Sequence, residues 1–169
     1  MSELIKIIEG NILQSNSSII VQQVNCLGRM GGGLAKQIME QYESVKPDYQ
    51  DFCDVHLKSG NTREELLGKV HFVKVKDGKV IANVFGQLNI RKHRWDKSVY
   101  TINDKLFEGI SIVKNYAEKN GLSIAIPTYI GCGLANGDWV EIKQGIDNIF
   151  KGSTVNVNYY HYRKSAKGK

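Results

Sequence analysis

Two glycine-rich loops, each following a short apolar run, constrain this chain more than any other feature of its sequence. The first loop spans residues 24–33 and the second spans 127–134. Glycine lacks a Cβ, so the backbone can approach a ligand closely and adopt positive φ without strain. Both loops lead into helical patterns, and free N–H groups at the start of a helix suit phosphate oxygens. Two such loops at the ends of neighbouring strands could hold a diphosphate between them.

The apolar periodicity predicts alternating strands and helices in one α/β domain. Strands are expected at residues 4–8, 19–24, 69–75, 80–85, 123–127 and 154–160. Helices are expected from residue 34 to just before Pro47, at 49–57, at 99–119 and from residue 139, with Asp138 as the N-cap of the last. This order predicts a mixed sheet between helices, with residues 1–162 as a single domain and 163–169 as a basic, flexible tail.

Composition is typical of a soluble globular protein. The 169 residues fit one domain, and 41% of them are hydrophobic against 24% charged. No apolar run approaches the ~20 residues of a membrane span. The N-terminal segment is acidic early and its apolar stretch is short, which is unlike a signal peptide. Cytoplasmic residence without membrane contact is therefore the expectation.

The cysteines predict neither a disulfide framework nor a metal site. There are three, Cys26, Cys53 and Cys132, with no CxxC pair, and the histidines are scattered along the chain. Cys26 and Cys132 both lie in the glycine loops and could approach each other, although a role as small neutral loop residues is the favoured interpretation. No metal and no cofactor is expected.

The charge balance is basic, with a formal net charge of +6 and a pI of about 9.2. Part of the excess lies in the segment 91–97. A basic balance suits an anionic partner, either a nucleotide or a nucleic acid, and it equally suits a solvated surface. No nucleic-acid-binding motif is present, so nucleic acid is the weakest of these hypotheses, and the role of the segment stays open.

Neither glycine loop alone matches a standard nucleotide motif. Gly31–Gly33 is not followed by the Lys-Ser/Thr of a P-loop and lacks the GxGxxG spacing, so by itself it could be a tight turn between strand and helix. Asn25, at the end of its strand, could bind a ribose hydroxyl or cap its own turn. The pairing with the second loop is what favours a ligand.

Four motifs, in order along the chain, resemble those of macro domains. They lie at residues 9–13, 25–37, 83–87 and 126–134, and the resemblance extends from residue 4 to 160. The most similar branch holds terminal ADP-ribose glycohydrolases and the yeast-type ADP-ribose 1″-phosphate phosphatase. The resemblance implies a three-layer α/β/α sandwich with a six-stranded mixed sheet and a cleft for ADP-ribose.

The same resemblance implies particular ligand contacts. Asn11 and Ile12 would meet the adenine, and the distal ribose would be surrounded by Asn25, Gly31, Gly32 and Gly33. The diphosphate would be held by the backbone amides of Ile130, Gly131, Cys132, Gly133 and Leu134. The implied partner is ADP-ribose or a derivative of it, including ADP-ribosylated protein.

The chain departs from the catalytic residues of both branches. Gln87 stands where the glycohydrolases have a lysine nucleophile, and Ala135 stands where they have an aspartate. Gln22 occupies the position of the phosphatase histidine, and Asn11 replaces the family's usual aspartate at the adenine site. Neither catalytic set therefore transfers whole.

Two functions follow from these observations. In the first, a positioned water removes phosphate, an acyl group or a protein side chain from the distal ribose of an ADP-ribose derivative. Asn25 and Asp138 are the candidate catalytic residues and His93 is a further candidate base, although Asp138 could instead cap its helix and His93 could be solvated. In the second, the chain binds ADP-ribose or ADP-ribosylated targets without chemistry, which Gln87 and Ala135 favour.

Overall fold

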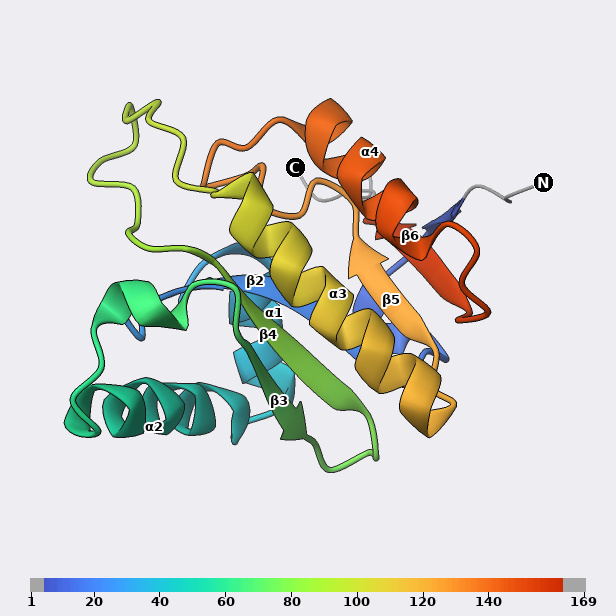
Figure 1. The fold of residues 1–169 in the computed structure, drawn as a ribbon, viewed down its shortest axis with the longest axis horizontal. Helices are drawn as coiled ribbons and strands as arrows, with labels where there is room; N and C mark the ends of the chain where they lie inside the picture. Colours follow the sequence, from blue (N-terminus) through green and yellow to red (C-terminus); the bar gives the residue numbers. More distant parts are fainter. Residues whose placement is uncertain (1–4, 163–169) are drawn as a thin grey trace.

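A computed structural model describes residues 5–162, in which six strands form one mixed sheet (Figure 1). The strands are β1 (Lys6–Glu9), β2 (Ile19–Asn25), β3 (Val70–Lys74), β4 (Val80–Gln87), β5 (Ile124–Pro127) and β6 (Val157–His161). Their order is β1-β6-β5-β2-β4-β3, and all neighbours are parallel except the hairpin of β3 and β4. The tail predicted at 163–169 and the strand start predicted at residue 4 lie outside the described residues.

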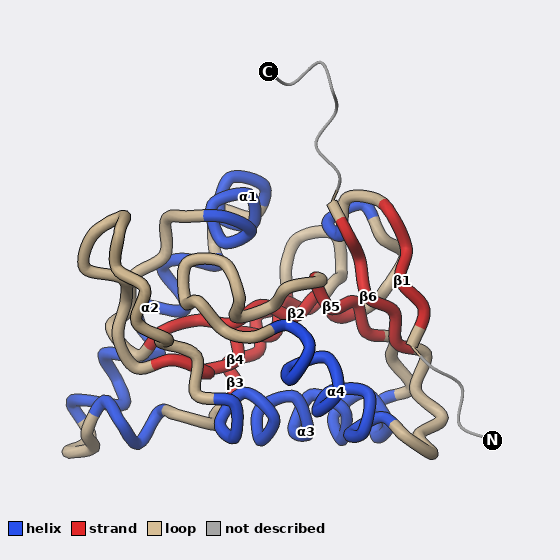
Figure 2. The backbone as a smooth tube through the Cα atoms, turned by 90° about the horizontal axis from the view of Figure 1, so that it is seen from above, coloured by secondary structure: helices blue, strands red, loops and turns tan. Residues whose placement is uncertain are grey.

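Helices cover both faces of the sheet. They are α1 (Gly33–Gln41), α2 (Val45–Lys58), α3 (Asn103–Asn120) and α4 (Trp139–Phe150), with short 3-10 turns η1 (Ile12–Gln14) and η2 (Arg63–Leu66). Figure 2 shows α1 on one side of the sheet and α3 and α4 on the other. None of the helices within residues 5–162 is long and apolar enough to cross a membrane.

Alternation along the central strands builds two cores, because successive side chains of a strand point to opposite faces. In β2, Ile20 and Val24 pack with Tyr49 of α2 in one core. Ile19 and Val21 pack in the other core, with the apolar faces of α3 and α4. This confirms the expected three-layer α/β/α sandwich with a six-stranded mixed sheet.

Two predicted helix boundaries were wrong. Lys46 was expected to leave the helical conformation ahead of Pro47, but α2 begins at Val45 and includes both. Proline is tolerated in the first turn of a helix because its missing N–H would have no intrahelical partner there. The helix expected from residue 99 begins at Asn103, because Thr101 instead forms a β-bridge with Gln87 and the Ile102 N–H donates to the Gly86 carbonyl.

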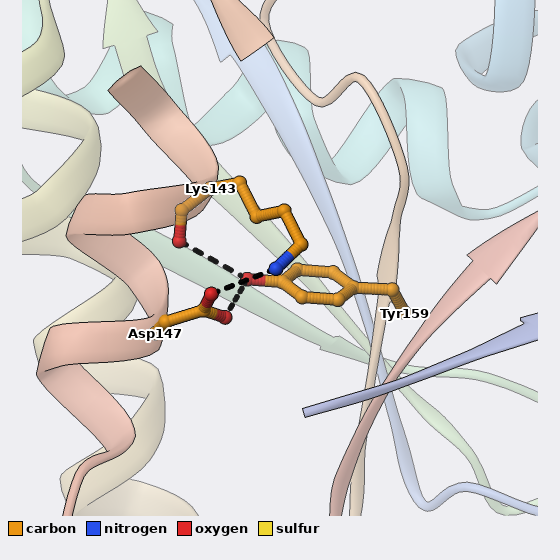
Figure 3. A network of polar contacts seen from close by, with 3 residues as sticks. All are labelled: Lys143, Asp147 and Tyr159. Carbon is orange, nitrogen blue, oxygen red and sulfur yellow. Dashed lines mark hydrogen bonds and ion pairs between the residues drawn. The ribbon is translucent and has the colours of Figure 1, made fainter. Parts of the chain in front are cut away.

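A buried tyrosine of β6, which lies between β1 and β5 in the sheet, links this strand to α4 (Figure 3). The Tyr159 hydroxyl donates to Asp147 Oδ1 at 2.8 Å, and Lys143 Nζ lies 2.8 Å from Asp147 Oδ2. Burial is the main cause that raises the pKa of Tyr159, so the hydroxyl stays protonated and keeps its donor role. This network fixes the helix that follows the second glycine loop.

Replacing Tyr159 with Phe should lower the free energy of unfolding by about 1–3 kcal/mol, the cost of losing a hydrogen bond to a charged, poorly solvated group. Urea unfolding followed by circular dichroism measures the change. Tyr116→Phe is the matched control, since the Tyr116 hydroxyl makes no hydrogen bond within the described residues while its ring stacks on Phe72. Equal stability of the two variants would contradict the role given to Tyr159.

Candidate functional site

A cavity of about 870 Å³ opens between the two glycine loops, at the carboxyl ends of β2 and β5. Its volume lies within the ~300–1,000 Å³ typical of small-molecule sites. β2 and β5 are parallel neighbours, so the loops that follow them emerge at one edge of the sheet. The prediction that both loops share one rim is confirmed.

The Asn25 side chain organises the first loop. Its Oδ1 accepts from the N–H groups of Leu27 and Arg29, at 3.0 and 3.2 Å, while its Nδ2 donates to the Arg29 carbonyl at 2.8 Å. The buried Tyr49 hydroxyl donates to the Asn25 carbonyl at 2.5 Å and lies 3.0 Å from Oδ1. Asn25 lines the cavity but is only 8% exposed, because its carboxamide is engaged in holding the loop. The turn-capping interpretation of Asn25 is thus realised.

The first loop ends at an uncapped helix N-terminus. α1 begins at Gly33, and no side chain caps it at Gly32. The N–H groups of the first turn therefore lack intrahelical acceptors and can bind an anion. A Cβ at Gly32 would lie 2.9 Å from Leu134 Cδ1 in the second loop, so the two loops nearly touch across the cavity.

The second loop is held from beneath by side chains of other segments. Gly131 has φ 73°, and its carbonyl accepts from Thr101 Oγ1 at 2.5 Å and from the Gly137 N–H at 2.9 Å. Two non-glycine residues, Tyr129 and Asn136, also have positive φ, at 62° and 59°. Such strain persists only where surrounding contacts fix the backbone, which is a property of preformed ligand loops.

The basic segment 91–97 clamps this second loop. Arg91 Nη2 donates to Asn136 Oδ1 at 2.8 Å, and the Asn136 Nδ2 donates to the carbonyls of Asp96 and Ser98. The Asp96 carboxylate accepts from Tyr100 Oη at 2.5 Å and from two backbone N–H groups, and these bonds hold its pKa well below the usual range. The segment is therefore an ordered wall of the cavity, which answers the question that the sequence left open.

The cavity is electropositive. Four cationic side chains line it, those of Arg29, Lys46, Arg91 and Arg94. Among the described residues along its walls, none is Asp or Glu. With two backbone loops and no counter-charge, the arrangement favours a ligand that carries negative charge. It cannot supply carboxylate ligands to a metal ion, and within residues 5–162 there is no cluster of His, Cys, Asp or Glu suited to one.

Gln87 lines the cavity with its carboxamide committed to neighbours. Its Oε1 accepts from Gln23 Nε2 and its Nε2 donates to the Asn89 carbonyl, both at 2.9 Å. Gln23 Nε2 also donates to Thr101 Oγ1 at 2.9 Å. Because the lone pair of an amide nitrogen is delocalised into its carbonyl, Gln87 cannot act as the nucleophile that a lysine would be.

The structure brings most of the predicted site residues together around the cavity. Those that line it are Asn25, Gly31, Gly32, Gly33, Ile130, Gly131, Gly133 and Leu134. Asn11, Ile12, Cys132 and Asp138 do not line it. Asn11 caps η1, Ile12 is buried in the core, and Asp138 Oδ1 caps α4 by accepting from the Val140 and Glu141 N–H groups.

Cys132 does not line the cavity, and its Sγ donates to the Ile130 carbonyl at 3.4 Å. Burial raises the pKa of its thiol to about 11, and the pKa of Cys26 to about 12. All three cysteines are free and neutral at pH 7, in line with the interpretation as small neutral residues.

Sequence reasoning missed the cavity residues contributed by other segments. Lys46 and Gln50 come from α2. Gln50 Nε2 donates to the Gly28 carbonyl at 3.1 Å, which ties α2 to that loop. The position of α2 depends on packing of Val45 and Tyr49 against the sheet, and no local pattern in the sequence signals it.

Comparison with known proteins gives a consistent picture. No protein-family model matches the sequence. A DNA ADP-ribosyl glycohydrolase of Mycobacterium tuberculosis is 30% identical over 146 residues, which cover 84% of this chain. The chain spans only 37% of that relative's length. The ADP-ribose glycohydrolase OARD1 of Bos taurus is 24% identical over 140 residues, which cover 81% of this chain and 79% of that protein.

Solved structures share the fold. The macrodomain of Mycobacterium tuberculosis DarG matches with a TM-score of 0.71 and 23% identity, over 94% of this chain and 98% of that one. Thermosipho africanus DarTG in complex with ADP-ribose matches with a TM-score of 0.71 and 20% identity, over 97% of this chain and 43% of that one. This chain is therefore a macro domain by fold, and it resembles the ADP-ribosyl glycohydrolase branch.

Proposed function

We propose that this chain binds ADP-ribose in the cavity, with the diphosphate between the two glycine loops. The observation that carries this proposal is the pairing of two amide-rich loops with cationic walls that lack carboxylates. A diphosphate offers the negative charge and the acceptor oxygens that such walls require. The relatives named as ADP-ribosyl glycohydrolases, and a neighbour solved with ADP-ribose, support the same ligand.

The proposed activity is hydrolysis of an ADP-ribose derivative at the distal ribose, releasing ADP-ribose. Water attack there needs a positioned water and a base. His93 lines the cavity, and an imidazole nitrogen there can accept a proton from water, so we assign the base to His93. Asp138, which lies off the cavity walls, is the second candidate, and Asn25 would act by holding the first loop against the ligand.

A binding module without chemistry is the second candidate function. Its support is that neither Gln87 nor Ala135 can act as a nucleophile or base, and that Gln87 is tied to Gln23 and Asn89. On this alternative the chain would hold ADP-ribose or an ADP-ribosylated protein and release it unchanged.

We propose a derivative of ADP-ribose, and not the free nucleotide, as the natural substrate. The derivative could carry ADP-ribose on phosphate, on an acyl group or on a macromolecule, and the mycobacterial relative is named for DNA. Arg94 lines the cavity and lies over the exposed ring of Trp95 at 4.3 Å, so a cation and an aromatic ring are both available at the rim. Cytoplasmic residence remains a prediction.

Replacing Gly32 with Glu should abolish ADP-ribose binding, because the new side chain would meet Leu134 and place an anion between the loops. Calorimetry on the parent should give micromolar-class affinity, roughly −7 to −9 kcal/mol. Gln37→Glu adds the same charge on the exposed side of α1, away from the cavity walls, and should bind normally. Unchanged affinity in a folded Gly32→Glu protein would exclude the first loop as a contact.

Hydrolysis is tested by incubating the protein with ADP-ribose 1″-phosphate, O-acetyl-ADP-ribose, ADP-ribosylated protein and ADP-ribosylated DNA, and measuring released ADP-ribose. On the substrate that reacts, His93→Gln should lower turnover about 100-fold, a typical contribution of a base. Asp138→Asn should leave turnover within about twofold, because Asn caps a helix as well as Asp does.

The reverse ranking of the two variants would make Asp138 the base. Borohydride should trap no lysyl adduct, because no lysine occupies the position of Gln87. An adduct on Lys46, the lysine of the cavity walls, would contradict the water mechanism. Release of ADP-ribose from none of the four substrates would favour the binding module.

A further inference from the structure

Three polar side chains form a hydrogen-bonded row across the sheet beneath α2. Gln22 of β2 pairs in register with Asn83 of β4, and Asn83 pairs in register with His71 of β3. Gln22 Nε2 donates to Asn83 Oδ1 at 2.7 Å, and Asn83 Nδ2 lies 3.2 Å from His71 Nδ1. Asn83 is fully buried and Gln22 is 3% exposed, so the row runs through an otherwise apolar core.

The two ends of this row face different spaces. Gln22 lines the cavity between the glycine loops. His71 lines a separate groove of about 410 Å³ beside α2, where the Phe52 ring lies 4.7 Å from the imidazole. The row therefore joins the proposed ligand site to a titratable group outside it.

In such a row, the donor or acceptor role of one side chain determines the role of the next, because each amide has one donating and one accepting end. A neutral His71 with an unprotonated Nδ1 accepts from Asn83 Nδ2, which directs Asn83 Oδ1 to Gln22. Gln22 Nε2 then faces Asn83, and Oε1 is the carboxamide atom left for a ligand. A proton on Nδ1 would turn the imidazole into a donor, and each buried amide would have to rotate to avoid facing another donor. Gln22 would then present N–H groups to the cavity in place of Oε1.

We propose that neutral His71 is a positioning residue, which acts through Asn83 to hold Gln22 Oε1 toward the cavity as the acceptor for a hydroxyl of the distal ribose. A ribose hydroxyl can donate to this oxygen, whereas a diphosphate has no proton to give. The expected location of the distal ribose, beside Asn25 at the end of the same strand, matches that assignment. This inference rests on the proposed binding of ADP-ribose.

The environment of His71 keeps it neutral at pH 7. Burial is the largest influence and lowers its pKa, while the Asp48 carboxylate opposes the decrease. The titratable groups that α2 presents to the same groove are Asp48, Asp51 and His56, and its neighbour on β4 is the uncharged Asn83. Because the neutral form binds better, affinity should fall as the pH drops through the pKa of His71.

The test is the dissociation constant of ADP-ribose, measured by calorimetry between pH 8 and pH 5. For the parent it should rise about threefold to tenfold toward acid, the range of a single hydrogen bond. His71→Asn places an amide oxygen near the Nδ1 position that cannot be protonated at these pH values. This variant should match the parent at pH 8 and lose the acid weakening.

Two controls separate this row from other titrations. The methyl ester of ADP carries the same diphosphate charge without a distal ribose, so its affinity should not change with His71. His93→Gln removes the imidazole of the cavity walls and should leave the acid weakening in place. In the unmodified protein, ¹⁵N NMR should show that saturating ADP-ribose lowers the pKa of His71.

Each other outcome overturns part of the proposal. Acid weakening that persists in His71→Asn excludes His71, and so does a His71 pKa that ADP-ribose leaves unchanged. Equal acid weakening with the methyl ester excludes the distal ribose as the group that Gln22 contacts. Failure of the parent to bind ADP-ribose at pH 8 would instead refute the proposed function on which the inference rests.

Discussion

The site depends on one topological constraint, the parallel adjacency of β2 and β5 at the centre of the sheet. Their pairing places two glycine loops, distant in sequence, at a single edge. Neither loop alone could surround a ligand, and each alone admits a purely structural interpretation. Together they form opposite walls that approach within contact distance at Gly32 and Leu134. The cationic side chains and the absence of Asp and Glu along the described cavity walls act on one ligand only because both loops face the same cavity.

Preorganisation of these walls comes from side chains that do not need to touch the ligand's reacting atoms. Asn25 uses its whole carboxamide within the first loop, and Arg91 ties the second loop to the basic segment. Asn136, which has a positive φ, is held by its hydrogen bond from Arg91. A site built in this way loses little conformational freedom on binding, which favours affinity. Chemistry then has to come from water and from few titratable groups.

Local signals predicted much of this architecture. The alternating runs gave the strands and the β3–β4 hairpin, and Asp138 was identified as the cap of α4 from its residue type and position. Tertiary features could not be predicted in the same way. Pro47 was expected to follow the end of a helix, but it lies in the first turn of α2, where proline is tolerated. Lys46 reaches the cavity only through the packing of α2, and the Gln22–Asn83–His71 row requires the register of three strands.

The most direct test of the two-loop site is the change in backbone amide chemical shifts on titration with ADP-ribose. The account predicts the largest changes in both loops, at Gly31–Gly33 and at residues 131–134, with saturation at one common dissociation constant. It predicts little change in the groove beside α2 that Asp51 and His56 line, apart from effects passed through His71. Changes confined to one loop, or centred on that groove, would contradict the claim that the parallel pair β2 and β5 builds the ligand site.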